Sequence, residues 1–306
     1  MMIARTRNTP YADREEAGKI LGREILEHPG FINTSQAHAA ERKRIRPKKK
    51  PPILVLGLCR GGVPVARTVA HMLKAPFDFC IVQKLSTALN PELAIGALVE
   101  SRLEPEIEPE IEPEIEPEIE PEIGPRLPTR KDEFALGAGP PKSCDSPGKP
   151  AARGEASNGM LEVLNREILE HVRDADAQLE ASRLREAAEL RRRVALYRRH
   201  GRCETLEGKR VILVDDGAAT GTTMRAAIAA AKHRGAKEII VALPVAPEEV
   251  CAELKTEADA VICPWSPKFF VSVGAYYAHF PQVSDEEVCA ASAAMQGTFR
   301  EEGAMR

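Results

Sequence analysis

Two adjacent carboxylates followed by a short run of small and hydroxyl-bearing residues carry the clearest chemistry in this sequence. Asp215 and Asp216 come directly after Val211–Val214, an apolar run typical of a buried parallel strand. The seven residues that follow the acids are Gly217, Ala218, Ala219, Thr220, Gly221, Thr222 and Thr223. Their backbone N–H groups and three hydroxyls, with the start of a helix predicted over 224–232, would surround an anion of phosphate size. With two acids ready for sugar hydroxyls, the pattern predicts a site for a phosphorylated sugar.

Other classes of protein also place paired acids at the tip of a strand, among them receiver domains and metal-dependent hydrolases. Here the apolar strand, the acid pair and the Thr-Gly-Thr-Thr run occur together and in order, which favours phosphate binding. No Gly-Lys-Ser/Thr follows the strand and no Gly-x-Gly-x-x-Gly opens a helix, so the two common nucleotide-binding signatures are absent. A hard cation such as Mg²⁺ would offset the negative charge, and Asp215 and Asp216 are its candidate ligands.

Two stretches resemble the type I phosphoribosyltransferases. Val214–Thr223 is similar to the motif with which that family binds phosphoribosyl pyrophosphate (PRPP), and Ile53–Ala66 is similar to its pyrophosphate loop. Asn90–Ala97 and Val273–Tyr277 resemble a subgroup of stand-alone phosphoribosyltransferase-domain proteins without an assigned substrate. The resemblance implies an α/β fold with a mainly parallel central sheet and helices on both faces.

The resemblance also implies an activity, which is Mg²⁺-dependent transfer of the phosphoribosyl group from PRPP to an acceptor with release of pyrophosphate. Asp215 and Asp216 would be the catalytic and metal-binding residues, holding the ribose hydroxyls directly or through Mg²⁺-bound water. Residues 217–223 would bind the 5′-phosphate. The leaving pyrophosphate would be bound by Arg60, Gly61 and Gly62.

One position departs from the family pattern. Purine-type relatives usually have an aspartate where this sequence has Ala219, and that aspartate serves the purine ring as a base. Because Ala219 cannot accept a proton, ordinary hypoxanthine or guanine chemistry is in doubt and the acceptor, expected to be a nitrogenous base, is left open. Two alternatives remain: a non-catalytic PRPP or nucleotide sensor on the same fold, and a hydrolase of a phosphorylated sugar or ester.

The length fits a single domain over 1–306, with a basic insertion at 30–50 and a low-complexity insertion at 101–158 that we expect to be disordered. Within the second insertion, Glu104–Ile123 is five copies of Glu-Pro-Glu-Ile, in which proline at every fourth position excludes helix and internal strand. Without its ten carboxylates the net charge of −3 becomes +7. The remaining body is therefore basic, which suits a polyanionic substrate.

Composition also bears on partners and location. The basic run at 42–50 contains no aromatic residue that would stack on bases, so nucleic-acid binding is not favoured, although nuclear import is an alternative to the expected cytoplasmic location. Seven scattered cysteines without metal spacing indicate reduced thiols. No apolar run is long enough for a membrane span. We expect PRPP and a small-molecule acceptor as partners and leave a homodimer open.

The elements that must position the site are predicted more coarsely. Residues 17–25 have helical apolar spacing, and Phe77–Val82 is predicted to be a strand that leads to Lys84. At that strand end Lys84 would lie near both phosphate loops and could meet the substrate, and a surface lysine is an equal alternative. Leu161–Arg199 is predicted to be one long helix, with the basic cluster Arg191–Arg193 on a solvated face. The aromatic residues after 264 are predicted to form a packed core, with an aromatic hood that stacks a base as the alternative.

Overall fold

The structure, a computed structural model, describes residues 9–29, 31, 51–88, 94–101, 152–156, 159–199, 203–291 and 293. These residues fall in one unit, 1–105 together with 150–306, whereas the second unit, 106–149, lies outside the described residues. The repeat at 104–123 and the basic run at 42–50 therefore lie outside them too, and the predicted single domain with its two insertions stays a prediction.

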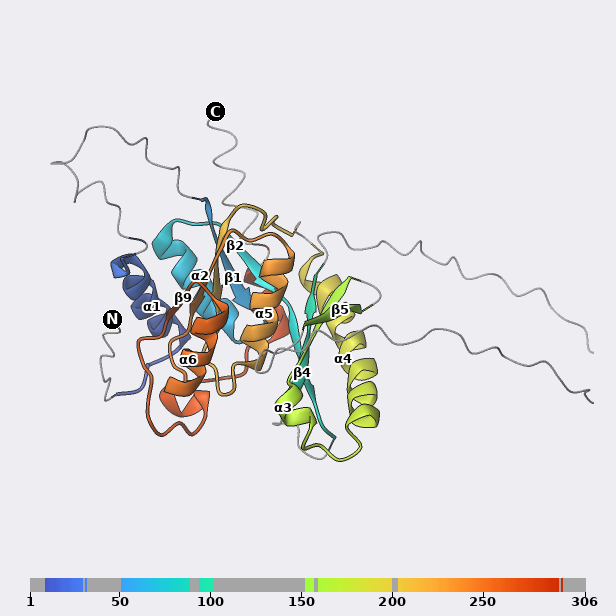
Figure 1. Cartoon of the computed structure of the whole chain (residues 1–306). Helices are drawn as coiled ribbons and strands as arrows, with labels where there is room; N and C mark the ends of the chain where they lie inside the picture. Colours follow the sequence, from blue (N-terminus) through green and yellow to red (C-terminus); the bar gives the residue numbers. More distant parts are fainter. Residues whose placement is uncertain are drawn as a thin grey trace, which may run out of the picture. The chain divides into compact units, whose positions relative to one another are not determined.

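A five-stranded parallel sheet forms the centre of the described unit, in the order β2-β1-β7-β8-β9 (Figure 1). Its strands are β1 (Ile53–Leu58), β2 (Phe77–Cys80), β7 (Arg210–Val214), β8 (Glu238–Ala242) and β9 (Ala260–Ile262). The helices that connect or cover them are α1 (Arg14–Glu27), α2 (Gly62–Leu73), α5 (Thr222–His233) and α6 (Glu248–Glu257).

Both faces of this sheet are buried, which explains the continuous apolar strands. Alternate residues of β1 point to opposite faces: Leu54, Leu56 and Leu58 pack in one core cluster with α5 and α6. Val55 packs in the other cluster, with apolar residues of α1 and α2. The predicted fold, a mainly parallel sheet with helices on both faces, is confirmed.

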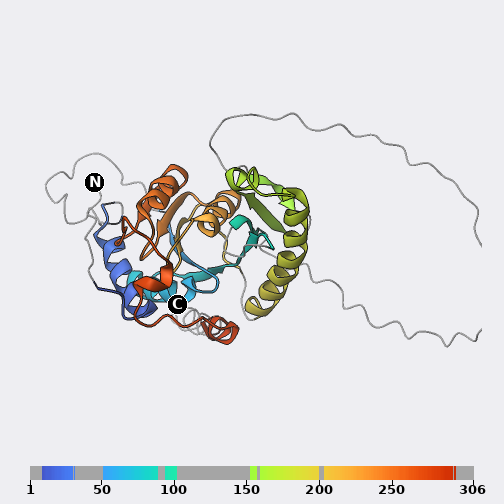
Figure 2. The ribbon, with the colours of Figure 1, turned by 90° about the horizontal axis from the view of Figure 1, so that it is seen from below.

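A second, antiparallel sheet in the order β3-β4-β6-β5 adjoins the first. Its strands are β3 (Val82–Ser86), β4 (Ala94–Glu100), β5 (Ala152–Ala156) and β6 (Met160–Leu164). The short α3 (Arg166–Leu169) follows β6, and the long α4 (Ala175–Tyr197) then packs along β3 and β4 (Figure 2). The stretch predicted as an insertion, 101–158, contains strand β5. Its residues 152–156 therefore belong to this sheet.

Two of the predicted elements are divided differently in the structure. The predicted strand Phe77–Val82 changes sheets at Ile81: β2 pairs with β1, and β3 pairs with β4. Lys84 consequently lies inside β3, opposite Ala97, and not beyond a strand end.

The long helix predicted over Leu161–Arg199 is in fact β6, α3 and α4. Leu161 and Leu164 have a spacing that fits a helix, but all five residues of β6 are buried in the sheet. Asn165 then ends the strand and caps α3, because its side chain accepts a hydrogen bond from the backbone N–H of Ile168. A strand buried on both faces cannot be distinguished from a helix by apolar spacing alone.

Most aromatic residues near the C-terminal end of the described chain form a packed cluster, as predicted, but Phe269 is 90% exposed and does not belong to it. Tyr11, Tyr276 and Tyr277 are buried together with Val245, and Trp265 packs edge-on against Tyr276 at 4.8 Å between ring centroids. Further partly buried members are Ile20, Phe270, Val273 and Phe280. The 3₁₀ turn η1 (Val273–Tyr276) leads into this cluster.

Candidate functional site

The acid pair and the Arg60–Gly62 turn meet at one edge of the parallel sheet. Strands β1 and β7 are parallel neighbours with Gly57 opposite Val214, so the residues that follow each strand emerge side by side. A Cβ atom on Gly61 would lie 2.2 Å from Oδ2 of Asp216, and one on Gly62 would lie 2.6 Å from the carbonyl oxygen of Val214. Only glycine permits this approach.

The two acids differ in their surroundings. Asp216 is 9% exposed, whereas Asp215 is half-buried. Oδ1 of Asp215 accepts a hydrogen bond of 2.9 Å from the backbone N–H of Asp216. Oδ2 of Asp216 accepts a hydrogen bond of 2.9 Å from Nε of Arg14 and forms an ion pair with Nη2 of Arg14 at 2.8 Å. Arg14 is the first residue of α1 and was not predicted as a site residue.

The electrostatics of the acid pair favour a cation. Burial raises the pKa of Asp215 well above its ordinary range, and the neighbouring Asp216 charge raises it further. Burial also raises the pKa of Asp216, while Arg14 opposes that rise. Two ionised carboxylates this close repel each other, so an approaching positive charge stabilises them.

The loop behind the acids keeps most of its donors free. The N–H of Ala218 donates to the carbonyl of Val245 at 3.1 Å, which fixes the loop on the segment after β8. Within the described chain, no partner is found for the N–H groups of Ala219, Thr220 or Gly221, and Ala219 and Thr220 are exposed. Gly221 has φ of +71°, a left-handed conformation that suits glycine, and it leads directly into α5.

The hydroxyls of the loop lie in the same place. Thr222, the first residue of α5, is buried, and its Oγ1 lies 3.2 Å from Oγ1 of Thr220. Thr223 follows on the first turn of α5 and is half-buried. Gly217 is tightly packed, since a Cβ there would lie 2.7 Å from Val273. The loop 217–223 therefore presents free N–H groups, hydroxyls and a helix N-terminus beside the acids.

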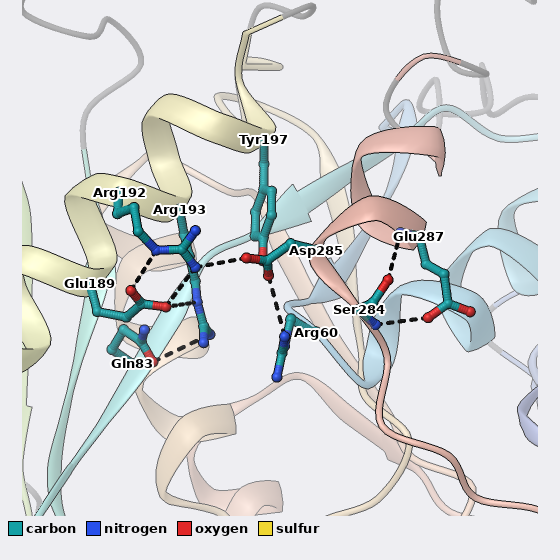
Figure 3. Close-up of polar contacts among 9 residues, drawn as sticks. All are labelled: Arg60, Gln83, Glu189, Arg192, Arg193, Tyr197, Ser284, Asp285 and Glu287. Atoms are coloured by element: carbon teal, nitrogen blue, oxygen red, sulfur yellow. Dashed lines mark hydrogen bonds and ion pairs between the residues drawn. The ribbon is translucent and has the colours of Figure 1, made fainter.

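Arg60 adjoins this site but is engaged elsewhere. Its Nη1 lies 3.3 Å from Oδ1 of Asp285, as Figure 3 shows. Asp285 already accepts a 2.5 Å bond from the hydroxyl of Tyr197 and a 2.7 Å bond from Nη2 of Arg192. The cluster Arg191–Arg193 was predicted to lie on a solvated face. Arg192 instead binds Asp285, and the side chain of Arg193 is 16% exposed and bonded to Glu189.

A capping box sets the position of Asp285. The backbone N–H of Glu287 donates to Oγ of Ser284, and the backbone N–H of Ser284 donates to Oε2 of Glu287, at 3.2 Å and 2.8 Å (Figure 3). Ser284 therefore begins the helix at 285–291 and places Asp285 in its first turn. The Ser-x-x-Glu pattern was the sequence signal for this residue, but its partner Tyr197 on α4 had none.

Replacing Asp285 by asparagine should alter the acid stability of the protein. Partial burial alone would raise the pKa of Asp285, but hydrogen bonds from Tyr197 and Arg192 and the charge of Arg60 lower it to about 2. Ionised Asp285 therefore stabilises the fold above pH ~4, and that contribution is lost as the pH falls from about 4 to about 2. Asp285→Asn should lose less stability over this range than the wild type.

Urea unfolding at successive pH values, followed by the fluorescence of the single tryptophan, Trp265, measures this difference. The control is Asp176→Asn, which makes the same chemical change at an exposed position of α4 and should behave as the wild type. Equal pH profiles for wild type and Asp285→Asn would show that the ion pairs of Asp285 do not stabilise the fold.

Comparisons with known proteins agree with this fold. Residues 163–278 match the family model described as "Phosphoribosyl transferase domain". The chain is 30% identical over 253 residues to a Mycobacterium tuberculosis protein named "Putative phosphoribosyl transferase Rv0571c", covering 83% of this chain and 44% of that protein. It therefore spans less than half the length of the curated relatives that it matches.

A solved structure is similar over nearly its whole length. The crystal structure of TT1426 from Thermus thermophilus is 28% identical, covers 94% of this chain and 99% of its own, and has a TM-score of 0.57. Together these findings define the class of the fold as that of the phosphoribosyltransferases. The chain belongs to the phosphoribosyltransferase family.

Two further absences concern the described residues only. They contain no group of three or more His, Cys, Asp or Glu side chains arranged to hold a metal ion. None of their helices has the length and apolar character needed to cross a membrane. The six described cysteines are free, and Cys59, which follows β1, packs partly buried against the core.

Proposed function

We propose that this protein binds PRPP with Mg²⁺ and transfers its phosphoribosyl group to a nitrogenous base, releasing pyrophosphate. The observation that carries the proposal is the meeting of the loop 217–223, with its free N–H groups, and the Arg60–Gly62 turn on either side of the acid pair. The first would bind the 5′-phosphate and the second the pyrophosphate, and the ribose would then lie between them at the carboxylates.

The residues present fit a magnesium ion that arrives with the substrate. Mg²⁺ is commonly held by one or two carboxylates together with substrate phosphates, so a cluster of three protein ligands is not required. Asp215 would bind the ion or the ribose hydroxyls, since its Oδ2 has no partner among the described residues. Bound Mg²⁺ would supply charge neutralisation for the phosphates.

The chain's own groups would then assist departure of the pyrophosphate. Loss of this group develops positive charge at the anomeric carbon, as in glycoside cleavage, and the carboxylate of Asp215 would offset that charge. Arg60 would stabilise the leaving group after turning from Asp285, a move that costs little because Tyr197 and Arg192 still satisfy Asp285. Exposed Ala219 offers no base, so the acceptor must be deprotonated by another group or bind already deprotonated.

Calorimetric titration with PRPP and Mg²⁺ tests binding, and pyrophosphate release with a panel of bases tests transfer. We expect binding by the wild type and at least about 100-fold weaker binding by Asp215→Asn, because the ribose loses its charged acceptor. Glu170→Gln, an exposed carboxylate at the end of α3, is the control and should bind as the wild type. Absence of PRPP binding by the wild type would disprove the proposal.

A second candidate is a sensor that binds PRPP without transferring it. The contact of Arg60 with Asp285 and the absence of a base at Ala219 favour it. Binding of PRPP that is lost in Asp215→Asn, together with silence across the whole panel of bases, would support the sensor. Release of phosphate or pyrophosphate without any base would instead indicate hydrolysis.

A further inference from the structure

Arg14 is fully engaged at the candidate site. Besides its hydrogen bond and ion pair with Oδ2 of Asp216, its Nη1 donates to the carbonyl of Pro281 at 2.6 Å. Its guanidinium lies over the ring of Phe280, 3.8 Å from the ring centroid. The side chains of Arg14 and Asp216 are 10% and 12% exposed. This is a fixed, buried ion pair with the stacked geometry that arginine favours.

The position of Arg14 is fixed both by the helix that it begins and by the backbone that precedes it. Asp13 caps α1 by accepting a 2.8 Å bond from the N–H of Glu16, so that Arg14 begins the helix. The preceding backbone pairs with the C-terminal segment: the N–H of Tyr11 donates to the carbonyl of Tyr276, and the N–H of Ala278 donates to the carbonyl of Tyr11. Arg14 therefore joins α1 to this segment.

Asp216 joins the same segment to the loop after β7. The hydroxyl of Tyr277 donates to the backbone carbonyl of Asp216 at 2.5 Å, and Gly61 packs against the Asp216 carboxylate. Three separate parts of the chain thus converge on Asp216, whose Oδ2 is already committed to Arg14. Asp215, in contrast, is more exposed and keeps Oδ2 without a partner among the described residues.

We propose that the two acids have different tasks: Asp215 faces the ligand, whereas Asp216 and the positioning residue Arg14 form a buried link that assembles the site from α1, the loop after β7 and the C-terminal segment. This inference rests on the proposed function for the identity of the ligand. It goes beyond that proposal because it assigns a role to Arg14 and separates the acids.

The experiment combines Arg14→Met, Asp216→Asn, their double variant and Asp215→Asn. Binding is measured by calorimetry with PRPP and Mg²⁺. Assembly is measured by the emission of Trp265, the single tryptophan, which lies in the aromatic cluster with Tyr11. We expect Asp215→Asn to lose binding by about 100-fold while Trp265 emission is unchanged. Arg14→Met and Asp216→Asn should each weaken binding by about 10-fold and shift the emission.

The double variant decides whether Asp216 acts through Arg14. If the two residues form one link, breaking it twice has no further effect, and the double variant binds PRPP as weakly as the worse single variant. Multiplied losses in the double variant, with Trp265 emission unchanged in Asp216→Asn, would show that Asp216 contacts the ligand itself and would overturn the proposal. Arg14→Lys, which keeps the charge but not the fork, should recover part of the affinity.

Two controls on the same helix separate this role from general stability. Arg23→Met makes the same chemical change at an exposed position of α1 and should bind as the wild type. Leu21→Ala removes a fully buried side chain of α1 that does not contact Asp216, so it should lower stability without the loss of affinity. A loss of affinity in Leu21→Ala equal to that of Arg14→Met, at equal stability, would overturn the proposal.

A failure of the proposed function can be distinguished from a failure of the Arg14–Asp216 link. If the wild type does not bind PRPP, the assigned ligand is wrong and the task given to Asp215 falls with it. The link is then judged alone, by Trp265 emission and urea unfolding. Additive effects of Arg14→Met and Asp216→Asn on those two readouts would overturn it as well, whereas non-additive effects would support it.

Discussion

Arg198→Met is expected to lower the free energy of unfolding by about 3–5 kcal/mol, the usual cost of removing one partner from a buried ion pair. Arg198 follows α4, and its side chain is 7% exposed. It donates from Nη1 to Asp78 on β2, and from Nε and Nη2 to the two carboxylate oxygens of Glu100 on β4. A further bond of 3.0 Å reaches the carbonyl of Phe79.

The size of this effect follows from what remains after the change. Asp78 and Glu100 are 1% and 8% exposed, so the variant leaves two carboxylates buried without their cation. Because Asp78 belongs to the parallel sheet and Glu100 to the antiparallel sheet, their repulsion acts where the two sheets adjoin. Methionine keeps much of the aliphatic volume, so little of the loss comes from packing.

Urea unfolding followed by Trp265 fluorescence and by circular dichroism measures this loss. Arg191→Met, at an exposed position of α4, is the matched control and should change stability by no more than about 0.5 kcal/mol. A variant that unfolds during purification is compared instead by its yield of folded protein against Arg191→Met. Equal stability of the two variants would show that Arg198 is not needed to neutralise the buried acids.

Gly62→Ala is expected to weaken PRPP binding by about 100-fold, since a displacement of about 1 Å at a site costs that much. The new Cβ would lie 2.6 Å from the carbonyl oxygen of Val214 and 2.8 Å from Cα of Asp215. Both neighbours are backbone atoms, at the end of β7 and directly after it, and cannot turn aside. The Arg60–Gly62 turn must therefore move away from the acid pair.

Calorimetry with PRPP and Mg²⁺ measures this affinity, and urea unfolding measures the accompanying strain, which we expect to be about 1–3 kcal/mol. Gly208→Ala is the control: it has φ of +70° and no atom within 4 Å of the added Cβ, so it should lose stability and keep affinity. Wild-type affinity in Gly62→Ala would show that the close approach of the two loops is not needed for binding.

The sequence predicted the parts of this fold whose signals are local. The apolar strand before Asp215 and the small-residue turn after Arg60 each predict a strand end, and parallel pairing brings such ends together. The sequence did not predict the second sheet, because Phe77–Val82 reads as one strand and gives no sign that its partners change at Ile81. Apolar spacing likewise hid β6 within a predicted helix.

The residues of the candidate site also fall into those with a local sequence signal and those without one. Glycine, threonine and aspartate in a short run identify the loop 217–223, since their chemistry is contained in one segment. Arg14 and Asp285 were missed because each acquires its importance from partners far away in sequence, Asp216 for the first and Tyr197 for the second. The caps at Asp13 and Ser284 mark where two helices begin, but a cap does not say what the first helical residue will meet.

The pairing of Tyr11 with Tyr277 has a consequence for folding during synthesis. These residues lie near opposite ends of the described chain, so they are separated by a long stretch of sequence. We expect such a contact to form slowly. A nascent chain can complete the strands of the parallel sheet while Pro281 is still inside the ribosome, and Arg14 then has no carbonyl to bind. On the proposed function, the link from Arg14 to the C-terminal segment would therefore complete the ligand site only after that segment has left the ribosome.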